Sequence, residues 1–197
     1  MAALEPSLSA FVLLLGVNRR YDQLTHHTVF FSANYREEFH DIFNRLVAPR
    51  DPTIYVCATT RTDPTQAPPE SENLFILVNA PYLSDEFSWA AERESYRALV
   101  LEKLEHMGLA DLRKHIVFEQ MITPEDLALR YGAQRGAIYG FSSNSLFAPF
   151  TRPQNRSRDV RGLYFVGGSV HPGGGVPLVM LSGKIVADLV QRDLGGA

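Results

Sequence analysis

The sequence Arg161-Gly-Leu-Tyr-Phe-Val-Gly-Gly-Ser-Val-His-Pro-Gly-Gly-Gly-Val-Pro-Leu-Val-Met-Leu-Ser-Gly-Lys184 predicts a strand, a glycine loop and a helix in direct succession. Leu163 to Val166 is a short run of apolar, aromatic and β-branched residues, which is typical of a buried strand. Two glycines stop this run, and from Val176 the apolar residues recur at helical spacing. Glycines allow a close approach of the backbone, and the first N–H groups of a helix favour negative charge. The stretch therefore predicts a site for an anionic group, such as the phosphate of a nucleotide or dinucleotide.

The predicted anion site consists of the loop and the first turn of the helix. Its residues are Gly167, Gly168, Ser169, His171, Pro172, Gly173, Gly174, Gly175, Val176 and Pro177. A tight turn without a ligand is the alternative, which a lone pair of glycines would favour. Five glycines favour a close approach instead, because each adds unfolded-state entropy. His171 is the titratable group of the set, and a proton-handling role and packing against Pro172 explain it equally well, so we assign no catalytic residue.

The same stretch resembles the C-terminal signature of the bacterial phytoene desaturase family, the FAD-linked carotenoid desaturases and oxidases of the flavin amine oxidase superfamily. Further similar pieces follow in the same order along nearly the whole chain. They are Asn18-Arg-Arg-Tyr-Asp, His26-His27, Asp51-Pro-Thr-Ile-Tyr-Val-Cys, Arg61-Thr-Asp-Pro, Glu72-Asn-Leu, Arg135-Gly-Ala-Ile-Tyr-Gly and Arg152-Pro-Gln-Asn-Arg. A collinear set of this kind is far more specific than a glycine motif alone.

The resemblance implies an FAD-dependent oxidoreductase of carotenoid biosynthesis, which desaturates or oxidises a long polyene by hydride transfer to the flavin. The glycine loop would then lie at the FAD, and the segment Gly132 to Phe150 would run toward the substrate cavity and the flavin. Simple loop packing, with a close backbone approach at the two glycines around Ala137 to Tyr139, is the alternative for this segment. The motif versions found here hint at a later desaturase or a terminal oxidase rather than an enzyme for phytoene itself. The alternatives are a related flavin amine oxidase or retinol-saturase-like enzyme, and a non-catalytic remnant that folds without a cofactor.

The sequence departs from the family in one respect: it contains no G-x-G-x-x-G, the motif that opens the family's FAD-binding unit. We therefore expect the C-terminal part of a longer enzyme, with an N-terminal FAD-binding half as its missing partner. The expected fold is α+β. Residues 1–158 would form a partial substrate-binding domain with a mostly antiparallel sheet. Residues 159–197 would add the terminal strand, loop and helix of a Rossmann-like FAD-binding domain.

Apolar patterns predict the remaining elements. The expected strands are Ser9–Val17, Thr28–Ser32, Ile54–Thr59, Leu74–Ala80 and His115–Glu119, and the expected helices are Tyr35–Leu46, Ser88–Met107 and one that Thr123 caps. The third and fourth strands flank a proline-rich loop, which suggests an antiparallel pair. Ser9–Val17 is apolar throughout, so we expect it to be buried on both faces.

Composition limits the partners and the compartment. A formal net charge of −3 and 45% hydrophobic residues fit a globular chain without a general attraction to nucleic acid. The single cysteine, Cys57, cannot form an internal disulfide and is expected to be a buried structural thiol. We expect a cytoplasmic location, with peripheral contact to the cytoplasmic membrane as an option. The arginines of residues 151–158 would meet phosphate, anionic lipid headgroups or solvent.

The neighbouring histidines His26 and His27 raise the question of a metal. Adjacent residues of a strand point to opposite faces, so these two rings should not reach one ion. No Asp, Glu or Cys partner stands at a recognisable metal spacing. We therefore expect polar packing at a strand end and no metal site.

Overall fold

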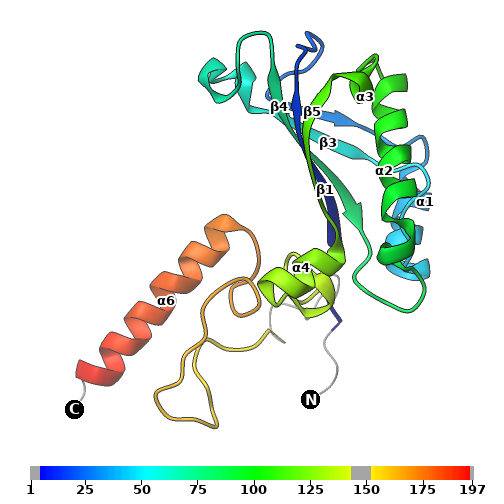
Figure 1. Cartoon of the computed structure of the whole chain (residues 1–197). Helices are drawn as coiled ribbons and strands as arrows, with labels where there is room; N and C mark the ends of the chain where they lie inside the picture. The colour runs from blue at the N-terminus through cyan, green and yellow to red at the C-terminus, as the bar shows by residue number, and fades with distance from the viewer. Residues whose placement is uncertain (1–4, 143–151, 196–197) are drawn as a thin grey trace. The chain divides into compact units, whose positions relative to one another are not determined.

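The computed structural model describes residues 5–142 and 152–195 (Figure 1). The chain divides into two compact units, one formed by Leu8–Gly136 and the other by Met1–Ser7 with Ala137–Ala197. This division follows internal contacts, and the assignment of residues 1–158 and 159–197 to a substrate domain and a cofactor domain stays a prediction.

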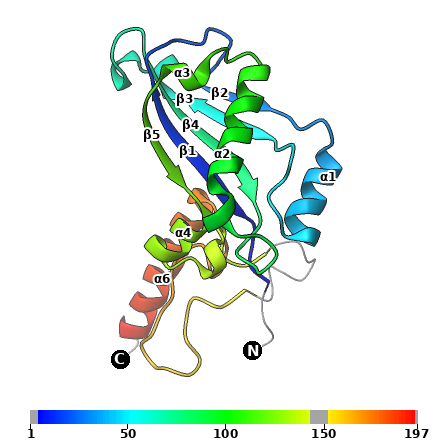
Figure 2. The same ribbon diagram turned by 45° about the vertical axis from the view of Figure 1, so that its right-hand side comes forward.

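The first unit contains a five-stranded antiparallel sheet in the order β2-β3-β4-β1-β5 (Figures 1 and 2). Its strands are β1 (Ser9–Val17), β2 (His27–Phe30), β3 (Ile54–Ala58), β4 (Glu72–Ala80) and β5 (Ile116–Ile122). The five strands expected between Ser9 and Glu119 are confirmed to within a few residues at their ends. The α+β fold class and the antiparallel pairing of β3 with β4 are confirmed as well.

One face of the sheet packs against the long helix α2 (Trp89–His106), as both views show (Figures 1 and 2). Phe11 of β1 stacks on Trp89 with ring centroids 5.6 Å apart and meets the edge of Tyr96 at 5.2 Å. Side chains alternate across a strand, so Leu13 and Leu15 join Phe11 on this face and are also buried. Complete burial of such a side chain contributes about 1.5–3 kcal/mol, which makes this layer the core of the unit.

The opposite face of the sheet is only partly covered within this unit. In β3 and β4 every second residue is buried while its neighbours stay half-buried or exposed, among them Tyr55, Cys57 and Phe75. β1 follows the same alternation from Leu14 onward, so the expected burial on both faces holds only for its first half. β5 is the edge strand beside β1 and leaves Val117 and Phe118 exposed.

The shorter helices follow their capping residues. α1 (Tyr35–His40) continues as a π-helical turn, η1 (Asp41–Arg45), and together they fill the expected helix. α4 (Pro124–Tyr131) begins with the predicted cap, in which the Thr123 hydroxyl and Asp126 carboxylate bond each other's backbone N–H. The remaining helical segments are α3 (Leu112–His115), η2 (Thr59–Arg61), η3 (Pro64–Gln66) and η4 (Gln134–Gly136). Among the described helices none has the length and apolarity needed to span a bilayer.

The second unit contains α6 (Val176–Gly195), which confirms the helix expected after the glycine loop. The buried strand expected at Leu163–Val166 is wrong. The structure has only an isolated antiparallel bridge between Arg156 and Tyr164, and Leu163 and Val166 are 40% and 60% exposed. A strand is stable only where neighbouring strands take up its N–H and C=O groups, and the described part of this unit provides no such sheet.

Candidate functional site

One buried amide, the side chain of Asn155, holds the glycine loop before α6 by hydrogen bonds. Asn155 Nδ2 lies 3.1 Å from the carbonyl oxygen of Phe165, 2.8 Å from that of His171 and 3.1 Å from Ser182 Oγ, so its two N–H groups are shared among three acceptors. Ser182, fully buried on α6, also accepts the N–H of Gly167 at 3.2 Å. Asn155 and Ser182 therefore hold the loop in one conformation against the helix.

The buried side chain of Arg152 also supports the loop. It is 7% exposed, and its guanidinium donates to the carbonyl oxygens of Gly168 and Phe141, both at 3.2 Å. This corrects the expectation that the arginines of residues 151–158 face phosphate, headgroups or solvent, because Arg152 serves the protein's own backbone. The exposed Arg156 forms an ion pair with Asp193 of α6.

Four of the five glycines of the predicted anion site divide into two groups. A Cβ on Gly173 would lie 3.1 Å from Arg152 Cζ, and one on Gly174 would lie 3.0 Å from Tyr139 Cβ. Packing inside the protein thus accounts for these two. Gly167 and Gly175 adopt φ angles of +123° and +96°, and a Cβ on either would meet no atom of the described residues within 4 Å. The loop therefore has one side closed by Arg152 and Tyr139 and another side open to a ligand.

The start of α6 lies on that open side. The first intrahelical hydrogen bond runs from the Val179 N–H to the Gly175 carbonyl at 2.9 Å, so the N–H groups of Val176 and Leu178 precede the ladder. Val176 is 74% exposed, and Pro177 carries no N–H. N–H groups outside the helix ladder, at the positive end of a 20-residue helix, are suited to an anionic group.

The remaining predicted site residues do not act as a cluster. Ser169 and His171 are exposed, and Pro172 follows His171 through a cis peptide bond. The His171 backbone is bonded on both sides, since its N–H donates to the Pro153 carbonyl at 3.0 Å and its carbonyl accepts from Asn155. Its contribution to the loop is thus through the backbone.

The segment expected to approach the flavin and substrate is described up to residue 142. A Cβ on Gly140 would lie 2.9 Å from Ser169 Cα, so the two backbones approach closely at this glycine. Residues 143–150 of that segment lie outside the described part of the chain, and its role at the flavin stays a prediction.

A second candidate surface is the partly covered face of the sheet, which we call the open face. Its members alternate with the core residues along all five strands. They are His27, Val29, Tyr55, Cys57, Asn73, Phe75, Leu77, Asn79, Ala10, Val12, Leu14, Gly16, Phe118, Gln120 and Ile122.

A cavity of about 270 Å³ lies on the open face. Its lining is mostly apolar and comprises Leu14, Leu15, Gly16, Cys57, Thr59, Asn73, Leu74, Phe75 and Phe118. A cavity for a complete drug-sized ligand measures about 300–1,000 Å³, so this one is large enough for only a section of a long molecule. A groove of about 560 Å³ elsewhere in the unit is lined in part by Arg50, Asp51, Glu102 and Lys103. A hydrocarbon there would desolvate charged groups, so the cavity on the open face is the better apolar site.

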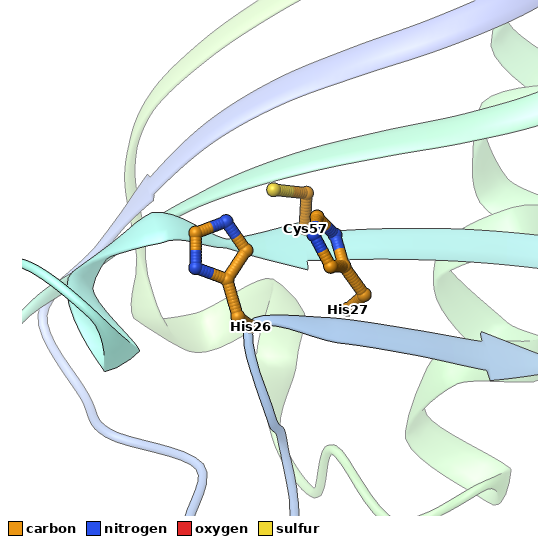
Figure 3. Close-up of side chains that lie close together, drawn as sticks. All are labelled: His26, His27 and Cys57. Carbon is orange, nitrogen blue, oxygen red and sulfur yellow. The ribbon is translucent and has the colours of Figure 1, made fainter.

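The open face ends at a cluster of two histidines and a cysteine (Figure 3). The ring centroids of His26 and His27 are 4.3 Å apart, which contradicts the expectation that the two rings point to opposite faces. β2 begins at His27, so His26 lies outside the strand and its side chain does not follow the alternation of strand residues between the two faces. In the register of β2 with β3, His27 stands opposite Cys57. Cys57 is half-buried rather than buried, and no local spacing reveals this pairing of two strands.

Two hydroxyl groups support this cluster. His26 Nδ1 lies 2.5 Å from Thr62 Oγ1, and His27 Nδ1 lies 2.8 Å from Tyr55 Oη. Burial raises the pKa of Tyr55 above its ordinary value, and the hydrogen bond and charge of Cys57 add to the rise. The phenol therefore stays protonated at neutral pH and can donate its proton to a neighbour.

The comparisons with known proteins agree with the resemblance. The 4,4'-diaponeurosporene oxygenases of Staphylococcus aureus strains MW2, MSSA476 and USA300 are each 45% identical to the chain over 187 residues. The match covers 95% of this chain, and the chain spans 38% of the length of these relatives. The predicted resemblance to carotenoid-modifying oxidoreductases is confirmed as homology to part of these proteins. No protein-family model matches the chain.

Among solved structures, an oxidoreductase from Methanosarcina mazei superimposes with a TM-score of 0.53 and 19% sequence identity. The superposition covers 94% of this chain and 35% of that one. At this identity the likeness supports the fold alone.

Proposed function

Because 187 residues of the chain are 45% identical to 4,4'-diaponeurosporene oxygenases, we propose that it is part of an FAD-dependent oxidoreductase of carotenoid biosynthesis. Its substrate is a long polyene, which the complete enzyme oxidises or desaturates. The observation that carries this proposal is the homology along 95% of the chain, since no isolated motif could mimic it.

The glycine loop is the proposed contact with FAD, and its geometry fits an anionic cofactor. Gly167 and Gly175 leave open space where a side chain would stand, and the N–H groups of Val176 and Leu178 point out of the helix start. When bound, the flavin would supply the hydride acceptor. The residues of the chain would bind the phosphate or ribityl side and stabilise negative charge through backbone amides. Arg152 and Asn155 would keep these amides in place.

The open face is the proposed wall for the polyene. Leu14, Phe75 and Phe118 line its cavity and are the side chains expected to contact a hydrocarbon. These groups exclude water and fix the position of the chain, and no acid or base is needed to bind it. A polyene is dissolved in lipid, so we also propose a cytoplasmic enzyme that works at the surface of the cytoplasmic membrane.

The proposal is tested in a chimaera in which this chain replaces the matched 187 residues of the Staphylococcus aureus oxygenase. The relative then supplies the rest of the enzyme, including the FAD-binding half that the resemblance implies. We expect the purified chimaera to be yellow with bound flavin and to oxidise or desaturate a long polyene. A chimaera that folds but holds no flavin would overturn the assignment and favour the non-catalytic remnant. Turnover of an amine or a retinol instead would favour those related enzymes.

Val176→Glu tests the place of the cofactor, with Val176→Gln as the matched control. A carboxylate in the first turn stabilises the helix itself but repels an anionic ligand. We expect the Glu variant to lose at least about tenfold in flavin affinity, equal to about 1.4 kcal/mol, and the Gln variant to lose much less. Retention of flavin by both variants, measured by absorbance and by dialysis, would exclude this loop as the anion site.

A further inference from the structure

The cluster at the end of the open face brings three metal-ligating groups together from two places in the sequence. One ligand atom from each of His26, His27 and Cys57 lies within 4.8 Å of the other two. Figure 3 shows the Cys57 sulfur close to the far end of the His26 ring, with the His27 ring beside it. His27 and Cys57 face each other across paired strands, so the sheet itself fixes two of the three groups.

The surroundings of the two rings are those of metal-binding histidines. A ligating histidine usually makes a hydrogen bond through its second nitrogen, which fixes the orientation of the ring. Here both Nδ1 atoms already have hydroxyl partners, Thr62 for His26 and Tyr55 for His27. The Nε2 atoms are therefore the nitrogens left for an ion.

We propose that His26, His27 and Cys57 bind one Zn²⁺ ion. Imidazole and thiolate are ligands that zinc prefers, and three protein ligands leave a fourth position for water. Zinc bonds of about 2.0–2.3 Å place tetrahedral ligand atoms roughly 3.5 Å apart. The ligand atoms of the cluster lie within 4.8 Å of one another. Side-chain rotations that move these atoms by about one ångström therefore bring them to the spacing that zinc requires. Cys57 also lines the apolar cavity, which means that the ion borders that cavity.

A second group of potential ligands, Glu37, His40 and Asp41, provides an internal contrast. Arg45 forms ion pairs with both carboxylates of this group, so a guanidinium already occupies the place of a cation. The hydrogen-bond partners of the two histidine rings in the first cluster are instead uncharged hydroxyl groups, those of Thr62 and Tyr55. The proposal therefore concerns the first cluster and predicts no binding at the second.

Cobalt titration of the full chain tests the site, since Co²⁺ replaces Zn²⁺ and reports its ligands by colour. Cys57 is the only cysteine, so a sulfur-to-cobalt charge-transfer band can arise from this residue alone. We expect one equivalent of Co²⁺ to give this band together with tetrahedral visible bands, and Zn²⁺ to displace it. Isothermal titration should return one Zn²⁺ per chain.

Four variants separate the proposed site from adventitious binding. Cys57→Ser should abolish the charge-transfer band, and His26→Gln and His27→Gln should each weaken Zn²⁺ binding about tenfold or more. His40→Gln, in the second group, should leave binding unchanged. Circular dichroism confirms that each variant is folded. Absence of the band in the folded wild type, an unchanged affinity in both His26→Gln and His27→Gln, or a loss in His40→Gln would overturn the proposal. None of these readouts depends on flavin or on turnover.

Discussion

At the scale of single residues, the glycine loop shows how a few buried polar groups define a ligand site. The sequence identified the glycines but gave no sign that Asn155, Arg152 and Ser182 hold them in place. These three are buried polar residues that bond backbone atoms ten or more residues away, and Asn155 also bonds the side chain of Ser182. Hydrogen bonds of this kind leave no periodic pattern, so they become visible only in the folded chain.

Asn155→Leu should loosen this loop, because it leaves the carbonyls of Phe165 and His171 and the Ser182 hydroxyl without their donor. We expect a loss of about 1–3 kcal/mol in the stability of the second unit. Hydrogen exchange of the amides from 165 to 182 measures it as faster local opening. Gln154→Leu is the matched control, because Gln154 is an exposed amide next to Asn155 in the sequence and should change exchange little. Equal exchange in the two variants would refute the role of Asn155.

At the scale of elements, local patterns predicted the first unit well and the second unit poorly. β1 and β4 are long apolar runs, α2 carries a helical pattern, and the capping box of α4 lies within four consecutive residues. Leu163–Val166 carries the same apolar pattern as β3, yet it remains a single bridge because a strand depends on partners that its own sequence does not specify. The histidine cluster was missed for the related reason that pairing of β2 with β3 is a long-range property.

The contact of α2 with α3 carries a testable pH dependence. Glu105 of α2 accepts from the Arg113 backbone N–H at 3.0 Å and from its Nε at 2.8 Å. The hydrogen bond and charge of Arg113 hold the pKa of Glu105 below its ordinary value of 4.5. A lowered pKa means that the unfolded chain binds the proton more readily. The stabilisation is thus present above pH 4.5 and disappears as the pH falls through the lowered pKa.

Glu105→Gln should therefore reduce the free energy of unfolding at neutral pH by less than about 1 kcal/mol, since the pair is partly exposed. In strongly acidic buffer the variant and the wild type should become equally stable. Urea unfolding at both pH values measures the difference. Glu102→Gln on the same helix is the control, because Glu102 makes no ion pair in the described part of the chain. A difference between Glu105→Gln and the wild type that persists in acid would contradict the assignment to this carboxylate.

At the scale of the whole molecule, the hydrophobic core belongs to one unit. Every residue of the buried apolar cluster lies between Phe11 and Leu112, inside Leu8–Gly136. The described part of the second unit buries few apolar side chains, among them Ala137 and Val170, and α6 contributes only Ser182 as a buried residue. The stability of the chain should thus be concentrated in the sheet and α2.

A fragment of residues 8–136 should therefore fold on its own, whereas residues 137–197 should not. We expect the fragment to unfold cooperatively in urea and to give dispersed amide signals in an NMR spectrum. The complementary fragment, residues 137–197, is the matched comparison and should lack both features. An unfolded 8–136 fragment would show that its core requires the remainder of the chain.

The edge position of β5 has a practical consequence. Its outer row of N–H and C=O groups is unpaired within the described sheet, and Val117 and Phe118 flank it as exposed apolar side chains. Such an edge is a template on which another polypeptide can add as a sixth strand. Purified preparations should consequently tend toward edge-to-edge aggregation, and a lysine in place of Val117 would keep them soluble at higher concentration.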